Sequence, residues 1–154
     1  MNLFDSVPQL SNTEAIDWVH RQWGIRPTEC TPLDSERDQN FRIMADDQRQ
    51  FVLKISNRAE QPEFLKAQNE LLGHLSQRVE FTPLPLPSVA GEDVVAHAAS
   101  EHRFLTRLVS WLPGRPMADC KFVGHQLLRD IAARVAEVDN ATAGFQHPAF
   151  QRSF

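Results

Sequence analysis

The sequence predicts an α+β fold in which a five-stranded antiparallel sheet packs against one helix and is preceded by a short helix. Three observations support this prediction. An amphipathic helical segment opens the chain, short alternating segments joined by polar turns follow it, and a second amphipathic helix interrupts them after the third strand. One helix inserted among several strands is typical of a sheet that is covered on one face.

The composition is that of an ordinary globular protein. The chain has 154 residues, of which 42% are hydrophobic and 23% are charged, and its net charge is −4, which suits one modest domain. No cluster of Lys and Arg occurs, so neither nucleic acid nor an anionic membrane is expected as a partner. No apolar run of about 18 residues and no signal-peptide pattern is present. Because Cys30 and Cys120 are isolated, we expect a cytoplasmic protein with reduced thiols.

The first helix is expected to begin after Ser11 and to end at Gly24. Ser11 followed by Glu14 is a capping-box pattern, in which each side chain satisfies a main-chain N–H group of the first turn. Apolar residues recur at helical spacing within this segment, namely Ala15, Trp18, Val19 and Trp23. The segment is therefore predicted to be a short amphipathic helix.

Five strands are expected, in two groups. The first group covers residues 28–33, 41–45 and 50–56, and the polar stretch DDQR between the last two predicts an antiparallel hairpin. The second group covers residues 94–98 and 103–109. The stretch TPLPLPSVAGED before it has too many prolines for regular structure, so we expect a stiff connector there.

Two more helices are expected outside these strands. One begins at Pro62, which suits a first helical turn, and its apolar residues form one stripe: Phe64, Leu65, Leu71, Leu72 and Leu75. After the Pro/Gly-containing linker SWLPGRP, a last helix is expected over residues 122–140. Its apolar residues also lie on one side, namely Leu127, Leu128, Ile131, Val135 and Val138.

Lys54 stands in the middle of the apolar strand QFVLKIS and is a candidate functional residue. Side chains alternate along a strand, so Lys54 shares a face with Val52. That face could simply be the solvated side of an antiparallel sheet. Gln68, however, falls near the centre of the apolar stripe of the following helix, where a polar side chain needs a partner. A lysine facing this helix would supply that partner, and the alternative is a bond from Gln68 to main chain or water.

The segments PLDSERDQNFRI, FVLKIS, AQNELLGHL, TPLPLPSV and RFLTRLVSWLPGRPM occur in this order, and together they resemble the amino-terminal lobe of the aminoglycoside phosphotransferase and choline kinase family. The resemblance is strongest to the hydroxylysine-kinase-like branch, which includes kinase-like domains fused to class III aminotransferases. It runs from about Gln9 to Phe154. It implies a kinase-like fold with a nucleotide-binding lobe (1–109), a hinge or linker (110–119) and the start of a second lobe (120–154).

The resemblance also implies roles for particular residues. Lys54 corresponds to the strand lysine that contacts the α- and β-phosphates of ATP, and Gln68 stands where most relatives have the glutamate that pairs with it. An amide there offers no charge compensation, so the pair should hold Lys54 less firmly than an ion pair would. Main-chain groups near Ser110 and Leu112 are implied to contact the adenine edge. The glycine-free loop over the phosphates is implied to use three polar residues, namely Ser35, Gln39 and Asn40.

The machinery for phosphoryl transfer is missing from these 154 residues. None of the six histidines begins an HxD motif, which supplies the catalytic aspartate in this family, and no later metal-binding aspartate motif occurs. The sequence therefore contains no expected catalytic residue and no expected metal ligand, although the implied cofactors are ATP and Mg²⁺.

We interpret the chain as the nucleotide-binding part of an ATP-dependent phosphotransferase that acts on a hydroxyl of an amino alcohol or an aminoglycoside-like molecule. It is expected to be inactive as these 154 residues. A small-molecule substrate is expected only with a second lobe. The alternatives are a non-catalytic kinase-like binding or regulatory module and an unrelated small α+β domain. Without a second lobe, the apolar stripe of the 122–140 helix predicts self-association, or packing of that helix back on the sheet.

Overall fold

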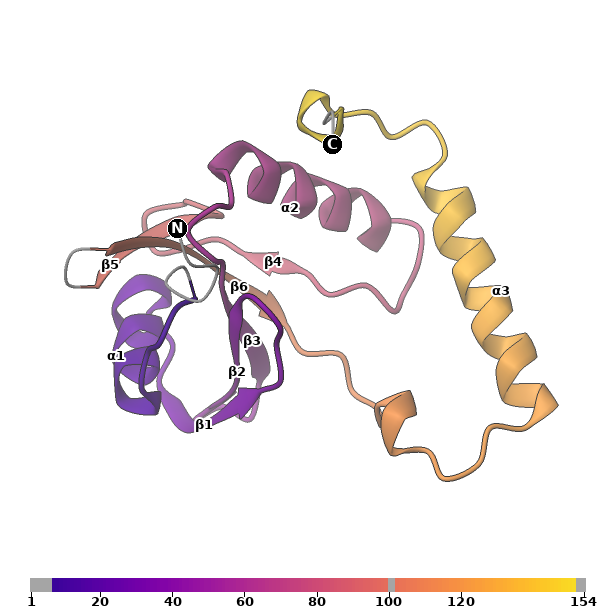
Figure 1. The fold of residues 1–154 in the computed structure, drawn as a ribbon, viewed down its shortest axis with the longest axis horizontal. Coiled ribbons are helices and arrows are strands. Elements are labelled where there is room, and N and C mark those ends of the chain that lie inside the picture. Colours follow the sequence, from indigo (N-terminus) through magenta and orange to yellow (C-terminus); the bar gives the residue numbers. More distant parts are fainter. Residues whose placement is uncertain (1–6, 100–101, 152–154) are drawn as a thin grey trace.

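The computed structural model describes residues 7–99 and 102–151, and the end of the segment expected to lead into a second lobe, 152–154, lies outside this part. The described residues form a six-stranded antiparallel sheet and three α-helices (Figure 1). The strands are β1 (Pro27–Leu33), β2 (Gln39–Ala45), β3 (Gln50–Ile55), β4 (Pro85–Leu86), β5 (Val95–Ala99) and β6 (His102–Ser110). The helices are α1 (Asn12–Trp23), α2 (Pro62–Ser76) and α3 (His125–Thr142), with short 3-10 turns at Met117–Asp119 and Pro148–Phe150.

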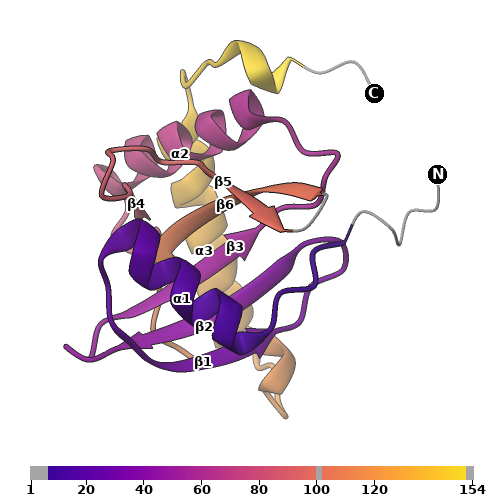
Figure 2. The same cartoon turned by 90° about the vertical axis from the view of Figure 1, so that its left-hand side faces the viewer.

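Helix α1 begins and ends where the sequence predicts. Ser11 and Glu14 form the reciprocal capping box, and Gly24 closes the helix in the left-handed conformation, with a φ of 65° that favours glycine. The buried side of α1 carries Trp18 and Val19, which pack with the sheet residues Phe41 and Leu53 into the main hydrophobic core. The short first helix therefore covers one face of the sheet, as Figure 2 shows.

The sheet has the order β1, β2, β3, β6 and β4, and all pairs are antiparallel. β5 pairs with the beginning of β6, on the edge where β4 pairs with its end. The expected count of five strands is therefore corrected to six. β4 lies in the segment expected to be a connector. It has two residues and includes Pro85, which has no N–H group to donate. Such a residue fits the edge of a sheet, where a strand pairs with a neighbour on one side only.

Helix α2 lies on the other side of the sheet from α1 (Figure 1). Its buried side chains are Leu65, Ala67, Asn69 and Leu75. The expected stripe is thus only partly correct, because Phe64, Leu71 and Leu72 are half-buried and line a cavity between α2 and the sheet. This cavity lies between α2 and the faces of β3 and β6 that carry Lys54 and Arg107.

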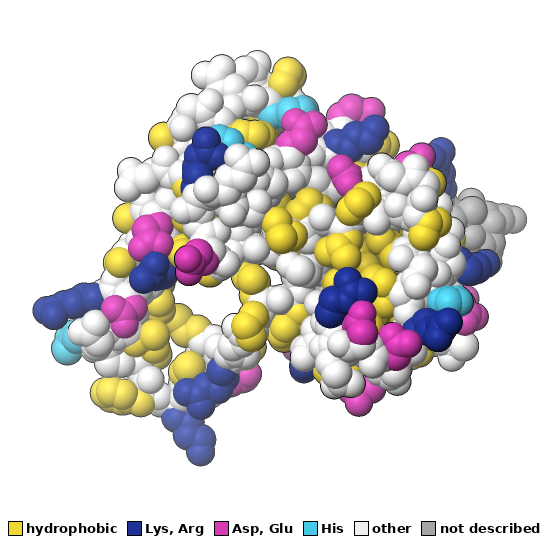
Figure 3. All heavy atoms as spheres, turned by 180° about the vertical axis from the view of Figure 1, so that it is seen from behind, with side chains coloured by type: hydrophobic (Ala, Val, Ile, Leu, Met, Phe, Trp, Pro, Cys, Tyr) yellow, Lys and Arg dark blue, Asp and Glu magenta, His cyan; other side chains and the backbone are white. Residues whose placement is uncertain are grey.

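Helix α3 does not pack on the sheet, which corrects one of the two expectations for it. It contacts the end of α2 through a small cluster in which Val138 and Ala141 meet Leu75 and Val79. Much of its apolar stripe remains exposed, since Leu128 is 48% and Val135 56% exposed. Figure 3 shows hydrophobic side chains on both sides of the opening between α3 and the sheet-containing part of the molecule.

Candidate functional site

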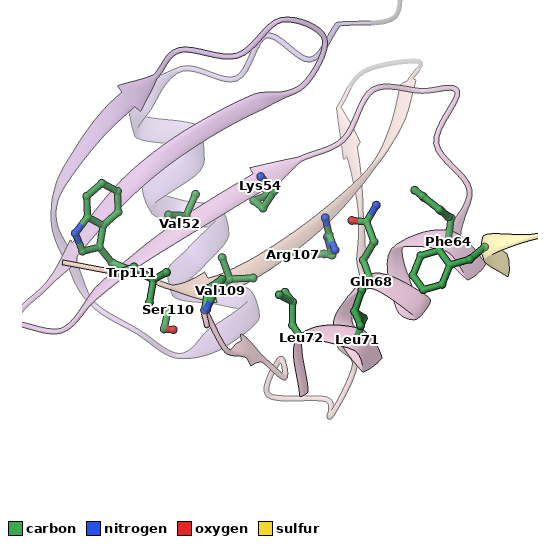
Figure 4. Close-up of a pocket in the computed structure, with 13 residues that line it drawn as sticks. Val52, Lys54, Phe64, Gln68, Leu71, Leu72, Arg107, Val109, Ser110 and Trp111 are labelled. Atoms are coloured by element: carbon green, nitrogen blue, oxygen red, sulfur yellow. The ribbon is translucent and has the colours of Figure 1, made fainter. Parts of the chain in front are cut away.

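The cavity between the sheet and α2 has a volume of about 540 Å³ and is the candidate site (Figure 4). One wall is the open face of β3 and β6, the opposite wall is α2, and the segment after β6 closes one end. Its residues are Val52, Lys54, Arg107, Val109, Ser110, Trp111 and Leu112 from the sheet side, Phe64, Gln68, Leu71 and Leu72 from α2, and Pro83 and Phe150. The cavity is mainly apolar with a small number of polar groups, as small-molecule sites usually are.

Lys54 reaches this cavity because of strand alternation. Phe51, Leu53 and Ile55 are buried against α1, so Val52 and Lys54 face the opposite side. The side chain of Lys54 makes no hydrogen bond or ion pair within the part of the chain that the structure describes. Burial lowers the pKa of Lys54, the nearby charge of Arg107 lowers it further, and Asp38 acts in the opposite direction. Lys54 is thus a half-buried cation without a bonded counter-ion among the described residues.

Three polar residues face one another across neighbouring strands. Asn40 on β2 is the register partner of Lys54 on β3, and Lys54 is in turn the register partner of Arg107 on β6. Directly opposed residues in an antiparallel pair point to the same face of the sheet. Both outer members carry a buried polar atom that has no hydrogen-bond partner in the described structure, namely Asn40 Oδ1 and Arg107 Nε.

Gln68 lines the cavity, but it does not form the predicted contact. Its side chain is half-buried, and no hydrogen bond to Lys54 is present in the described part of the chain. In the view of Figure 4 the Arg107 guanidinium lies between the two. The buried polar residue of α2 is instead its neighbour Asn69, which is only 3% exposed. On a helical wheel, Gln68 and Asn69 both lie near the apolar stripe. The one that contacts the sheet is Asn69, because Arg107 can reach it.

Arg107 connects the sheet to α2. Its Nη1 donates hydrogen bonds to Asn69 Oδ1 at 3.1 Å and to the main-chain oxygen of Leu65 at 3.4 Å. Asn69 Nδ2 in turn donates to the main-chain oxygen of Asp93 at 3.0 Å, so both ends of this amide are satisfied. Burial lowers the pKa of Arg107, and this is opposed by Asp38 and then Glu60. The polar link that the sequence places at Lys54 and Gln68 is therefore made by Arg107 and Asn69.

The segment after β6 presents its main chain to the cavity. Ser110 N donates to Leu84 O at 2.8 Å and Trp111 N donates to Gln50 O at 3.0 Å, so both of these donors are used within the sheet. The N–H group of Leu112 has no hydrogen-bond partner within the described residues. The Trp111 ring lies beneath the Arg42 guanidinium, whose central carbon is 4.7 Å from the ring centre.

The three predicted loop residues are not brought together. Ser35 lines a separate small hollow beside Asp38, Asn57 and Glu60. The Gln39 side chain is bonded to both the N–H and the carbonyl of Leu10 at 2.8 Å, so it fixes the segment before α1 rather than facing the cavity. Asn40 lies beside Lys54, as described above.

The described residues contain no group of three or more His, Cys, Asp or Glu side chains that could hold a metal ion. No helix in the described part is long and apolar enough to cross a membrane. Both cysteines are free, and burial raises the pKa of the Cys30 thiol to about 11.

Comparison with protein families decides the relationship of this chain. Residues 29–153 match the model of the phosphotransferase enzyme family, known as APH. The chain belongs to this family. Hydroxylysine kinase from Mus musculus is 29% identical over 92% of this chain, and hydroxylysine kinase from Danio rerio is 29% identical over 96% of it. These matches support the predicted hydroxylysine-kinase-like branch. The chain spans about two fifths of the length of these relatives, 41% and 43% respectively.

Solved structures confirm a kinase-like fold for this member of the phosphotransferase family. An amicoumacin kinase in complex with AMP-PNP and Ca²⁺ has a TM-score of 0.76 at 20% identity, and a microcompartment-associated aminopropanol kinase has a TM-score of 0.71 at 14% identity. Each match covers 94% of this chain and 44% of the other. The similarity thus extends over nearly all of the phosphotransferase-family chain and less than half of each kinase.

Sequence reasoning missed Arg107, which lines the cavity, and Asp38, whose charge acts on Lys54 and Arg107. Arg107 could have been found by counting back two positions from Val109, because both then point to the same face of β6. Asp38 carries no such signal, since its partner is the loop residue Asn57, whose N and Nδ2 donate to Asp38 Oδ1 at 2.9 and 3.0 Å. A contact of this kind depends on how the loop folds over the end of β3.

Proposed function

We propose that this chain forms the nucleotide-binding part of an ATP-dependent phosphotransferase that acts on a hydroxyl of a small molecule of the amino-alcohol or aminoglycoside-like class. The observation that carries the proposal is the half-buried Lys54, without a bonded counter-ion among the described residues, in a mainly apolar cavity. Such a cation can pair with an anionic group of a ligand, and an apolar cavity suits the flat base of a nucleotide. Membership of the phosphotransferase family supports the same reading.

In this proposal the adenine lies against the end of the cavity formed by the segment after β6. The N–H group of Leu112 is available to it, and the Ser110 carbonyl is the second proposed main-chain contact. Val52 provides an apolar wall between this segment and Lys54. The phosphates then extend toward Lys54, where the ammonium group binds them as a point charge.

The proposed acceptor class rests on relatives rather than on residues of this chain. The relatives are named as kinases of hydroxylysine and aminopropanol, which are both amino alcohols, and as an amicoumacin kinase. These 154 residues contain no HxD motif, so we propose that alone they bind nucleotide without transferring its phosphate. We also propose a cytoplasmic location, supported by the free cysteines Cys30 and Cys120.

Self-association through the 122–140 region is a further part of this proposal. It is supported by the exposure of Leu127, Leu128 and Val135 on one helix, at 36%, 48% and 56%. An apolar groove on α3, lined by Phe81, Ile131 and Val138 among others, lies beside these residues. Apolar surface of this kind favours contact between two copies of a chain.

A thermal-shift experiment with ATP tests whether the cavity is the nucleotide site. Val52→Trp fills the cavity wall, and Val89→Trp makes the same change at a loop position that is 71% exposed. At an ATP concentration of about 100 times Kd, binding stabilises the folded state by about 2.7 kcal/mol, which raises Tm by roughly 5–10 °C. We expect this rise in the wild type and in Val89→Trp, and its loss in Val52→Trp. An equal rise in both variants would contradict the proposed position.

A further inference from the structure

We propose that Arg107 is the second cation of the phosphate site, so that Lys54 and Arg107 bind the phosphates of the nucleotide together. This inference rests on the proposed function and adds a residue that sequence reasoning did not select. It concerns the pair of strands β3 and β6, which carry the two cations.

The register of the sheet places these two cations next to each other. Lys54 and Arg107 are direct partners in the antiparallel β3 and β6 pair, both face the cavity, and both line it. Opposed residues of such a pair have Cβ atoms about 4.5–5.5 Å apart, and two like charges in this position repel each other. An arrangement that is unfavourable in the empty cavity becomes favourable when an anion lies against both side chains.

Arg107 is held in a way that leaves part of its guanidinium for a ligand. Its bonds to Asn69 and Leu65 both use Nη1. The side chain is only 5% exposed, yet its buried Nε has no hydrogen-bond partner in the described structure. The two hydrogen bonds that anchor α2 use Nη1 of the guanidinium and do not involve Nε or Nη2. A donor of this kind, beside an unpaired lysine, is suited to an oxygen of a phosphate.

Two acids act on these cations through their charge. Asp38 favours the charged forms of both Lys54 and Arg107, and Glu60 favours that of Arg107. Asp38 also accepts hydrogen bonds from the N and Nδ2 of the loop residue Asn57. Gln68, the α2 residue that faces the same space, is neutral. The charged residues among those that line the cavity are Lys54 and Arg107, and two positive charges match a diphosphate or triphosphate better than an uncharged ligand.

Calorimetric titration of the 154-residue chain with ADP and with adenosine tests this inference. Arg107→Gln removes the proposed phosphate contact, and Arg103→Gln removes the same charge from an exposed position on the same strand. We expect Arg107→Gln to weaken ADP binding by about tenfold or more, because a hydrogen bond to a charged group is lost. Adenosine affinity should change by less than about twofold, and Arg103→Gln should resemble the wild type for both ligands.

Two results would overturn the inference. ADP affinity of Arg107→Gln equal to that of the wild type would exclude a contribution of Arg107 to phosphate binding. Equal weakening of ADP and adenosine would mean that Arg107 only anchors α2. If Arg107→Gln does not fold, Arg107→Lys serves instead: it keeps a charge, and the inference requires it to weaken ADP more than adenosine.

The same titration separates this inference from the proposed function. If Lys54→Met weakens ADP binding while Arg107→Gln does not, the nucleotide site stands and only the role of Arg107 is wrong. If the wild type binds neither ADP nor ATP, both proposals are wrong.

Discussion

Arg107 Nη1 lies 3.1 Å from Asn69 Oδ1, and this hydrogen bond ties β6 to α2 beside the cavity. The bond joins two residues that are each 5% exposed or less. Asn69 stands immediately after Gln68, the residue expected to make the corresponding contact with Lys54. This pair therefore makes a polar link between β6 and α2, and the Lys54 side chain has no bonded partner among the described residues.

Asn69→Ala should destabilise the protein more than Gln68→Ala. The first change leaves Arg107 Nη1 with one hydrogen bond, the 3.4 Å bond to Leu65 O. It also removes the side chain that donates to the Asp93 carbonyl. Each unsatisfied buried group costs about 1–3 kcal/mol. The Gln68 side chain is half-buried and is not needed for this link. Urea denaturation of both variants measures the difference. Equal free energies of unfolding would show that the Arg107–Asn69 bond does not stabilise the fold.

Lys54→Met should raise the stability of the nucleotide-free chain. Burial and Arg107 both disfavour the charged form of Lys54, as its lowered pKa indicates, so the folded state holds this charge at a cost near neutral pH. We expect Tm to rise by roughly 2 °C. Lys66→Met, at an exposed position of α2, is the matched control and should leave Tm nearly unchanged. A fall in Tm for Lys54→Met would mean that the ammonium group has a stabilising partner.

His97 should make the fold sensitive to mild acid. It is buried on β5 against the Trp18 ring, with ring centres 4.2 Å apart, and its Nδ1 has no partner among the described residues. Burial, and then Arg21, lower its pKa below the ordinary value of 6.5, while Glu14 opposes them. His97 therefore binds a proton at a higher pH in the unfolded chain than in the folded protein. The contribution of His97 to stability is lost as pH falls below about 6.5.

Thermal unfolding between pH 7 and pH 5 measures this effect. The loss of stability should be smaller in His97→Leu than in the wild type. His125→Leu changes an exposed histidine on α3 and serves as the control. If His97→Leu and the wild type lose stability in parallel, the acid sensitivity arises from other groups.

The exposed stripe of α3 should make the chain self-associate as its concentration rises. Replacing Leu128 and Val135 together by Lys puts charges at two of its most exposed apolar positions. Sedimentation velocity should then show a monomer where the wild type shows a larger species. A wild type that stays monomeric throughout the tested concentrations would leave this face without the proposed role.

Features that depend on local signals could be predicted from the sequence. The capping box at Ser11 and Glu14 and the left-handed Gly24 set both ends of α1, and alternation along QFVLKIS correctly placed Lys54 opposite the core. The polar turn DDQR correctly predicted the antiparallel hairpin of β2 and β3. These are short-range effects, in which each residue acts on neighbours a few positions away.

Features that depend on tertiary contacts could not be predicted as well. A helical wheel places Gln68 and Asn69 100° apart and does not show which of them meets the sheet. The answer depends on Arg107, which is far away in the sequence. β4 has only two residues, which is too few to show a periodic pattern. The Gln39 side chain is hydrogen-bonded to the main chain of Leu10, which lies too far away in the sequence for a local pattern to predict the contact.

Titration of the chain with ATP at fixed ionic strength, comparing Lys54→Met with Lys66→Met, tests the central claim most directly. Both variants lose one lysine charge, but only Lys54 lines the cavity. We predict that Lys54→Met weakens ATP binding by about tenfold or more and that Lys66→Met binds ATP as the wild type does. Equal affinities in the two variants would contradict the assignment of Lys54 to the phosphates.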